Sequence, residues 1–283
     1  MRLRTLPVGA ASVIAGVGMA CLDGVFRAAP AIICLVFALL AQTASNFANE
    51  YYDYRSGIDA PGRSGPRRGV TEGDITPRAM KRATYITLAA ACAVGCSLII
   101  WGGWWMLAAG ALIAVFAMAY SAGPYPLSRN ALGETAVVIF FGIVPVCLTY
   151  YLQTGHFSID TLVMSAAIGM LAANILVVNN YRDRFEDAAV GKRTEVTLWG
   201  ANYAIWDYGL HGTLAVIITV YIWIDFGYWA IIFPLIYFVA MLLLLQRMAT
   251  NEGSALNPVL GMTAMSELFF AVSFLTVAAL SMP

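Results

Sequence analysis

The chain has 283 residues, of which 60% are hydrophobic and only 11% are charged, and its formal net charge is zero. A soluble globular domain of this length does not need so large an apolar fraction, so the composition predicts a membrane protein with several spans. Zero net charge gives no electrostatic reason to expect a nucleic-acid partner. The five cysteines lie in apolar runs without metal-ligand spacing, which argues against a cysteine-based metal or redox site.

Apolar runs of about 20 residues, the length that crosses a bilayer, predict an all-α bundle of nine transmembrane helices. We interpret residues 1–283 as a single membrane domain, with the N-terminal run as the first span rather than a cleaved signal. In chain order the expected spans are 5–22, 30–53, 78–101, 104–121, 133–152, 159–180, 202–223, 227–246 and 261–281.

Two connections between these spans are long and polar. Residues 54–77 form a loop rich in glycine, proline and arginine. This loop is either a plain basic loop that touches anionic lipid head groups or a flap over a site, whose arginines meet a phosphate. Residues 181–201 are expected to form a second loop, with catalytic residues.

The placement of lysine and arginine predicts the orientation in the membrane. If the N-terminus is inside, all 16 basic residues except Arg27 fall in inner segments. Basic residues accumulate on the cytoplasmic side of membrane proteins. The N-terminus and both long loops are therefore predicted to be cytoplasmic, and the C-terminus to lie outside.

The first polar motif follows the second span. If that helix continues, Asn49 and Asp53 lie one turn apart on one face. Gly57 is a stop signal for the helix, which predicts that Asp59 bends back from the loop toward the same spot. A few oxygen ligands suit Mg²⁺, whose shell is usually completed by water and substrate phosphates. Taken alone, the motif is equally consistent with polar groups at a membrane boundary.

A second motif of the same kind follows the sixth span. Asp183 and Asp187 are four positions apart, directly after an apolar run. Two acidic helix ends on the same side of the membrane can face each other across one diphosphate. The repetition therefore favours a functional site over two unrelated membrane boundaries.

These motifs resemble the two signatures of the UbiA superfamily of intramembrane aromatic prenyltransferases. They read Asn49-x-x-x-Asp53 with Gly57-Ile58-Asp59, and Asn180-x-Arg182-Asp183-x-x-x-Asp187-x-x-x-Gly191-Lys192-x-Thr194. Four further segments resemble its menaquinone branch, the 1,4-dihydroxy-2-naphthoate polyprenyltransferases: Arg4-Thr5-Leu6-Pro7, residues 120–127, Leu132-Gly133-Glu134 and residues 252–264. The resemblance covers nearly the whole chain. Three departures are Gly57 and Glu50, where relatives often have aspartate, and Ser128-Arg129, where relatives carry a lysine.

The resemblance implies an enzyme that transfers a polyprenyl group from its diphosphate to 1,4-dihydroxy-2-naphthoate in menaquinone biosynthesis, with loss of CO₂ and diphosphate. It also implies a bacterial inner-membrane location, Mg²⁺ as cofactor, the two substrates and the lipid bilayer as partners, and no obligate protein partner. The residues implied as catalytic and as magnesium ligands are Asn49, Asp53, Asp183 and Asp187. Those implied at the diphosphate are Arg55, Arg129, Arg182, Lys192 and Tyr120, with Asn46, Glu50, Tyr51, Tyr52, Asp59 and Asn180 supporting the pocket. The tyrosines are equally consistent with an interfacial aromatic belt.

Two other functions remain open from the sequence. The same chemistry on 4-hydroxybenzoate or homogentisate would use the same metal motifs. A cation-coupled transporter also has paired acids in its spans, although there they lie at the midplane rather than beside arginines at one membrane face. Asp207, His211 and Glu267 lie within spans and are expected either to line a cavity or to pair helices.

Overall fold

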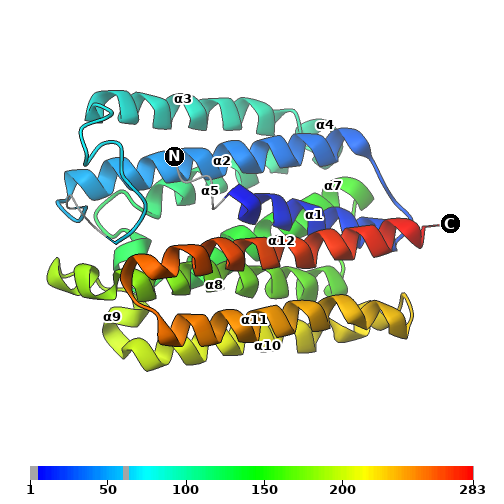
Figure 1. Ribbon diagram of the computed structural model, residues 1–283. Helices are drawn as coiled ribbons and strands as arrows, with labels where there is room; N and C mark the ends of the chain where they lie inside the picture. Colours follow the sequence, from blue (N-terminus) through cyan, green and yellow to red (C-terminus); the bar gives the residue numbers. More distant parts are fainter. Residues whose placement is uncertain (1–5, 60–63, 283) are drawn as a thin grey trace.

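The predicted spans are helices in the computed structural model, which describes residues 6–59 and 64–282 (Figure 1). The helices are α1 (Leu6–Leu22), α2 (Ala28–Arg55), α3 (Pro77–Cys96), α4 (Ile99–Gly102), α5 (Trp105–Ala119), α6 (Gly133–Val137), α7 (Val144–Thr154), α8 (Ile159–Ala189), α9 (Glu195–Trp199), α10 (Ala201–Ile224), α11 (Ile232–Thr250) and α12 (Asn257–Leu280). Short 3₁₀ or π segments are η2 (Leu127–Arg129), η3 (Val138–Ile143), η4 (Tyr228–Ile231) and η5 (Gly253–Leu256). The described residues contain no β-strand, which confirms the all-α prediction. Arg4 and Thr5 of the N-terminal motif and residues 60–63 of the flap lie outside the described residues.

Seven of the nine predicted spans correspond to helices that are long and apolar enough to cross a membrane, among the residues described. The other two, α1 and α5, have 17 and 15 residues. At 1.5 Å per residue these helices are about 25 Å and 22 Å long, which is less than the ~30 Å thickness of a bilayer's hydrocarbon core. Both pack along longer neighbours, α1 on α12 and α5 on α3. The nine-helix arrangement is therefore right in outline, with seven full-length spans.

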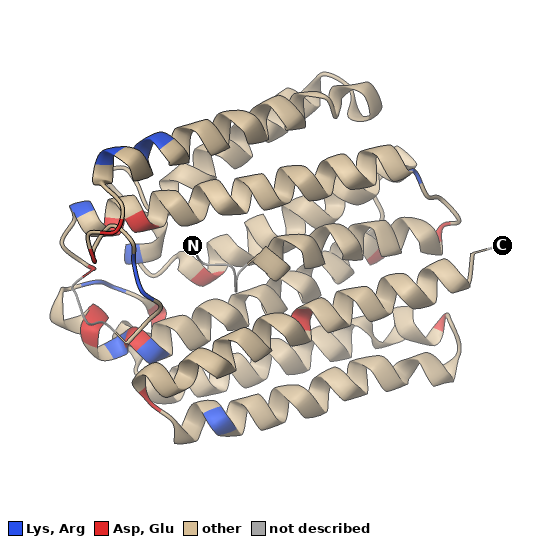
Figure 2. Ribbon diagram, turned by 45° about the horizontal axis from the view of Figure 1, so that its top comes forward, with Lys and Arg blue, Asp and Glu red and all other residues tan. Residues whose placement is uncertain are grey.

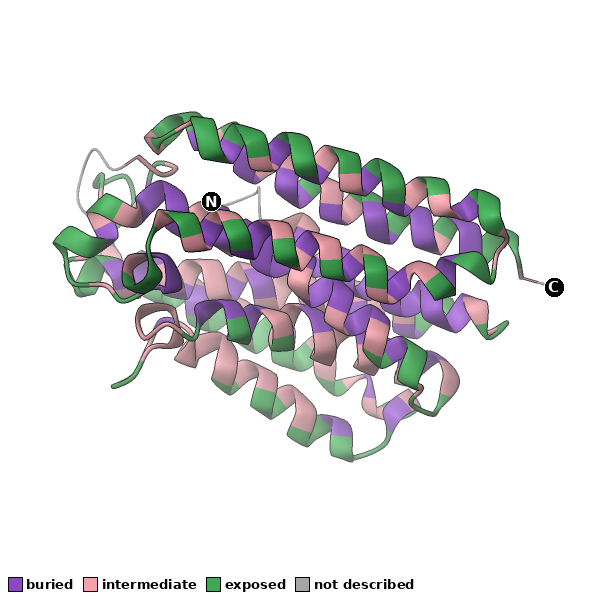
Figure 3. Cartoon of the chain, turned by 90° about the horizontal axis from the view of Figure 1, so that it is seen from below, coloured by how far each residue is buried: buried purple, intermediate pink, exposed green. Residues whose placement is uncertain are grey.

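The outer faces of the bundle are apolar. Ile32, Trp206 and Leu243 are each more than half exposed, and exposed positions follow the outward sides of the helices in Figure 3. So much exposed apolar surface is unfavourable in water and suits contact with lipid. Together with the apolar helices, this surface identifies an integral membrane protein.

Helix α8 lies at the centre of the bundle. Within its apolar stretch 72% of the residues are buried, compared with 17% in the helix Pro77–Gly102. It packs against α10, α12 and the π segment η3. The helix that carries the second acidic motif is thus held on several sides.

Both motif-bearing helices continue past the expected span. Helix α2 runs on to Arg55, and α8 runs on to Ala189 before Gly191 adopts a positive φ of 70°. The prediction of a loop over residues 181–201 was therefore wrong for most of its length, because α8 continues and α9 follows it. Alanine, arginine and glutamate in residues 182–189 favour the helix, and the first glycine comes only after it.

Charged side chains gather at one end of the bundle. In Figure 2 most Lys, Arg, Asp and Glu residues lie at the end where α2 stops and α8 stops, and few lie at the opposite end. Figure 1 shows that this end also holds the flap and α9. The two polar motifs, which are far apart in the sequence, therefore meet at the same end.

A close crossing of η3 and α8 depends on glycine. A Cβ atom added to Gly142 would lie 2.3 Å from the Cα atom of Gly169, and one added to Gly169 would lie 2.6 Å from the carbonyl oxygen of Val138. Backbone atoms cannot move aside cheaply, so the small residues allow the helices to approach.

We expect Gly142→Ala to destabilise the folded protein by about 1–3 kcal/mol, the usual cost of overpacking. Thermal unfolding of the purified protein in detergent measures the effect. The matched control is Gly261→Ala in α12, where an added Cβ meets nothing within 4 Å. Equal melting temperatures for the two variants would contradict the close crossing.

Candidate active site

The first motif presents its polar groups on one helix end. Asn49 and Asp53 lie one turn apart on α2, which confirms the predicted continuation of this helix. The helix ends at Arg55, and Gly57 has a φ of 70°, as a stop signal requires. The chain then turns so that Asp59 is buried, with Oδ2 at 3.1 Å from Nε of Arg68.

Arg68, in the flap, joins the polar groups of this motif. Its Nη2 donates to Oδ1 of Asn49 at 3.2 Å and lies 3.7 Å from Oδ2 of Asp53, while its Nε contacts Asp59. Only 3% of Arg68 is exposed. One of the two interpretations left open by the sequence put arginines of this loop at a phosphate, but it did not single out Arg68, because no local pattern shows which loop arginine turns inward.

Side-chain hydrogen bonds fix the flap at several points. Arg67 donates two hydrogen bonds to Asp74, at 2.9 and 2.8 Å, and this pair lowers the pKa of Asp74 because the guanidinium favours its charged form. Ser64 donates from its backbone N and its Oγ to Glu186 on α8, both at 2.8 Å. The flap therefore bridges the two motif-bearing helices.

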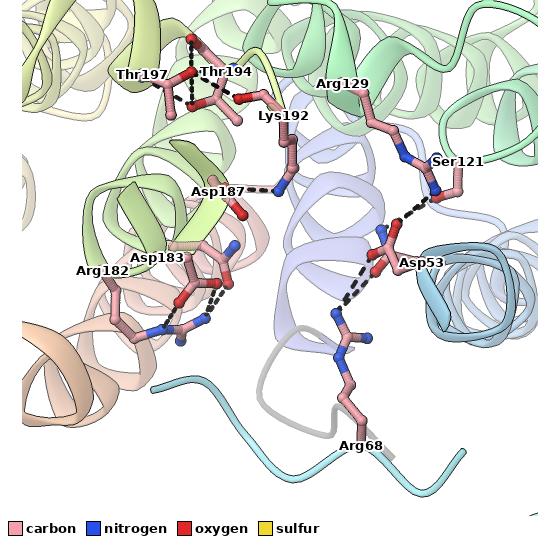
Figure 4. Close-up of polar contacts among 12 residues, drawn as sticks. Asp53, Arg68, Ser121, Arg129, Arg182, Asp183, Asp187, Lys192, Thr194 and Thr197 are labelled. Atoms are coloured by element: carbon pink, nitrogen blue, oxygen red, sulfur yellow. Dashed lines mark hydrogen bonds and ion pairs between the residues drawn. The ribbon is translucent and has the colours of Figure 1, made fainter. Parts of the chain in front are cut away.

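The second motif faces the first from α8 (Figure 4). Arg182 holds Asp183 with two short hydrogen bonds, at 2.6 and 2.7 Å. Lys192 follows the end of the helix and donates to Oδ2 of Asp187 at 2.8 Å. Across the site, Nη2 of Arg129 donates to Oδ1 of Asp53 at 3.0 Å. Each of these buried carboxylates thus has a cationic partner within the chain.

Between the motifs lies a polar chamber of about 50 Å³. We define it by Asn49, Asp53, Asp59, Arg68, Asn180 and Lys192, which line it together with neighbouring residues. It adjoins an apolar cavity of about 220 Å³ between α1, α2, α5, α7 and α8. Asn49, Tyr120 and Asn179 line both spaces. A polar chamber that meets an apolar cavity fits a ligand with an anionic head and a hydrocarbon tail.

Comparison with known proteins agrees with this geometry. Residues 10–266 match the model of the UbiA prenyltransferase family. The chain belongs to the UbiA prenyltransferase family. It is 37% identical to the 1,4-dihydroxy-2-naphthoate octaprenyltransferase of Escherichia coli (strain K12), over 71% of this chain and 67% of that protein. The enzyme of the same name from Haemophilus influenzae is 36% identical, over 71% of this chain and 68% of that protein.

Solved UbiA structures share the fold. The apo structure of a UbiA homolog from Aeropyrum pernix K1 has a TM-score of 0.71 at 15% identity and covers 95% of this chain and 97% of its own. A UbiA homolog from Archaeoglobus fulgidus bound to DMAPP and Mg²⁺ has a TM-score of 0.64 at 16% identity, with 97% and 98% covered. At such identities the likeness establishes the fold alone.

Several residues that sequence reasoning assigned to the pocket lie elsewhere in this UbiA family member. Glu50 accepts a hydrogen bond from the backbone N of Val70, at 3.0 Å, and Tyr51 packs against Val70 and Met80. Tyr52 faces α3, with its hydroxyl 3.4 Å from that of Tyr85. These three residues support the flap from the far side of α2 and line neither cavity. A helical period shows which residues share a face, but it does not show which neighbour that face meets.

The predicted diphosphate residues divide in the same way. Arg129, Lys192 and Tyr120 lie at the polar chamber or on its carboxylates, whereas Arg55 is exposed at the end of α2. Arg182 is not among the residues that line the chamber, and its remaining hydrogen bonds go to Asn179 and Asn257. Asn46 lines the apolar cavity and Asn180 the polar chamber.

The three charged residues left open by the sequence lie outside both cavities. Asp207 and His211 form a pair on α10, with 3.6 Å between Oδ2 and Nδ1. Glu267 is fully buried in α12. None of the three lines either space. The Asp207–His211 contact joins two residues of the same helix, so it does not pair two helices.

The donor atoms of the UbiA site fit a hard cation. The possible metal ligands are all side-chain oxygen atoms, and they come in two pairs: Asn49 and Asp53 on α2, and Asp183 and Asp187 on α8. Among the described residues, no three His, Cys, Asp or Glu side chains are grouped closely enough to hold a metal by themselves. Mg²⁺ typically takes one or two carboxylates and completes its shell with water and substrate phosphates. The arrangement fits a metal that a phosphorylated substrate helps to bind.

Proposed function

We propose that this protein transfers a polyprenyl group from polyprenyl diphosphate to 1,4-dihydroxy-2-naphthoate, in the menaquinone pathway, with Mg²⁺ as cofactor. The observation that carries the proposal is the polar chamber between two acidic motifs, open to an apolar cavity. The names of the bacterial relatives support the acceptor. Mg²⁺ and prenyl diphosphates in the A. fulgidus structures support the cofactor and the donor.

The chain's own residues would perform three tasks. Arg68, Arg129 and Lys192 would neutralise the diphosphate, because fixed cations in a chamber poor in water stabilise developing negative charge. The residues that would hold magnesium are Asn49, Asp53, Asp183 and Asp187, and the metal would share in this neutralisation. The apolar cavity would take the prenyl tail and exclude water from the reacting carbon.

The reaction then balances without an added oxidant or reductant. The allylic C–O bond breaks, and its electron pair leaves with the diphosphate. The ring carbon that carries the carboxylate attacks the allylic carbon and forms the new C–C bond. Loss of CO₂ returns the electrons of the broken C–CO₂ bond to the ring. No base is needed to remove a ring proton, since the carboxylate leaves in its place.

We also propose that the site faces the cytoplasm of a bacterial cell, with the C-terminus outside. The basic residues gather at the end of the bundle that holds both acidic motifs (Figure 2). Such an excess of lysine and arginine is typical of the cytoplasmic side.

A product assay tests the reaction and the acceptor together. We expect purified protein with Mg²⁺ and octaprenyl diphosphate to convert 1,4-dihydroxy-2-naphthoate into a prenylated product without the carboxylate, which mass spectrometry identifies. A parallel reaction contains 4-hydroxybenzoate. Product from 4-hydroxybenzoate alone would contradict the proposed acceptor but would still support prenyl transfer. No product from either acceptor would contradict the proposed function.

A further inference from the structure

The two loops that carry Arg129 and Lys192 are joined directly to each other. The backbone N of Ala131 donates to the carbonyl oxygen of Arg193 at 3.0 Å, and Asn130 pairs with Arg193 in an isolated parallel bridge. The backbone N of Glu134 donates to Oε1 of Glu195 at 3.1 Å. We call these contacts the cross-loop brace. It links the start of α6 to the turn before α9.

The brace lies between Arg129 and Lys192, two cations that contact carboxylates of the two motifs. Arg129 is two residues before Ala131, and Lys192 is directly before Arg193. Arg129 contacts Asp53 of the first motif, and Lys192 contacts Asp187 of the second. A change in the brace therefore alters the distance between the two cations across the chamber.

The backbone in the brace is strained. Ala131 has a φ of +52°, and among the described residues it is the one non-glycine with a positive φ. Residues other than glycine adopt this conformation at a cost, and they keep it only where neighbouring contacts enforce it. Here the hydrogen bond to Arg193 enforces it, which indicates that the position of this loop matters.

Glu195 is the side chain that closes the brace. It is only 4% exposed, and Thr194 fixes it at the start of α9 through a capping box with Thr197. Thr197 also donates to the carbonyl oxygen of Lys192 at 3.0 Å. Glu195 satisfies a backbone N–H in the first turn of the helix Gly133–Thr154, which has no partner within the helix.

We propose that Glu195 is a positioning residue, which fixes Arg129 and Lys192 at the separation that a diphosphate requires. This proposal rests on the proposed function. Glu195 itself does not line the polar chamber and acts through the two cations.

The first test is Glu195→Ala in the full-length protein in detergent, with KM measured separately for each substrate. We expect KM for octaprenyl diphosphate to rise about five- to tenfold, the factor that corresponds to one hydrogen bond. KM for 1,4-dihydroxy-2-naphthoate should change less than twofold. Glu195→Gln should restore the wild-type value, because the amide oxygen accepts the same N–H. The matched control is Glu72→Ala, at an exposed position.

Two results would overturn the proposal. One is a lower melting temperature in Glu195→Ala with no selective change in KM for the diphosphate, since that is what a purely structural residue gives. The other is a Gln variant as defective as the Ala variant. If Glu195→Ala does not fold, Glu195→Asp takes its place. Aspartate keeps the negative charge, but its side chain is one methylene shorter, so the carboxylate lies farther from the backbone N of Glu134.

A double-mutant cycle tests whether Glu195 acts through Arg129. The combined loss of diphosphate affinity in the double variant Glu195→Ala with Arg129→Ala should be smaller than the product of the two single losses. The reason is that both changes would weaken the same contact, the one between Arg129 and the diphosphate. Losses that multiply would contradict the proposal. Magnesium-dependent binding of geranyl diphosphate, measured by calorimetry, should weaken in Glu195→Ala even if the naphthoate is not the acceptor. That measurement separates a failure of the brace from a failure of the proposed function.

Discussion

Asp53→Ala and Asp183→Ala are each expected to abolish prenyl transfer, with a loss of about a thousandfold or more. The reason is that each motif would supply one of the carboxylates that help to neutralise the diphosphate, and such electrostatic contributions are large in a water-poor site. Turnover in detergent with Mg²⁺ and both substrates measures the loss. Retained activity in both variants would refute the site between the two motifs.

These variants need a control for folding. Both aspartates are paired with buried arginines, and removal of one partner from a buried pair costs about 3–5 kcal/mol. Asp53→Asn and Asp183→Asn keep the side-chain shape and part of the hydrogen bonding, so they should be inactive and yet closer to the wild type in melting temperature. Asp225→Ala, at an exposed position on the opposite end of the bundle, should leave both activity and melting temperature unchanged.

Arg68→Ala is expected to reduce turnover about a hundredfold or more. Arg68 is the flap residue that reaches Asn49, Asp53 and Asp59 at once, so its loss removes a cation from the polar chamber and leaves two buried carboxylates with one partner fewer. Lysine is a point charge and does not reproduce the planar guanidinium. Arg68→Lys should therefore recover only a small part of the activity.

The neighbouring arginine is the natural control. Arg67 is exposed and pairs with Asp74 on the outside of the flap. Exposed ion pairs contribute little to stability, so Arg67→Ala should retain wild-type turnover. Equal effects of the two substitutions would indicate that the flap contributes only its general charge.

Sequence reasoning worked where one helix determines the outcome. The spacing of Asn49 and Asp53 predicted a shared face, and Gly57 predicted the helix stop. The charge distribution placed both acidic motifs at one end of the bundle, as Figure 2 shows. These features depend on local periodicity and on residues with special backbone preferences, which a single sequence records directly.

It failed where the outcome depends on a partner from elsewhere in the chain. Arg182 has the pattern of a diphosphate residue, but it does not line the chamber, and its guanidinium bonds Asn257 in α12 as well as Asp183 and Asn179. Tyr51 and Tyr52 share the helix end with Asp53, yet they face the flap and α3. The inward turn of Arg68 and the contact of Glu195 with α6 also join segments many residues apart, and no local pattern encodes such contacts.

The pairing of carboxylates with cations around the chamber favours joint binding of the proposed metal and prenyl donor over separate binding of either. Asp53, Asp59, Asp183 and Asp187 are each matched by a guanidinium or an ammonium group of the same chain. A lone divalent cation would meet acids that are already neutralised, and a lone diphosphate would meet bases that are already engaged. On the proposed function, each would therefore create the site for the other, and their affinities would be coupled reciprocally. Magnesium and the prenyl donor would then enter together, as one complex of low net charge that exchanges partners with the paired side chains.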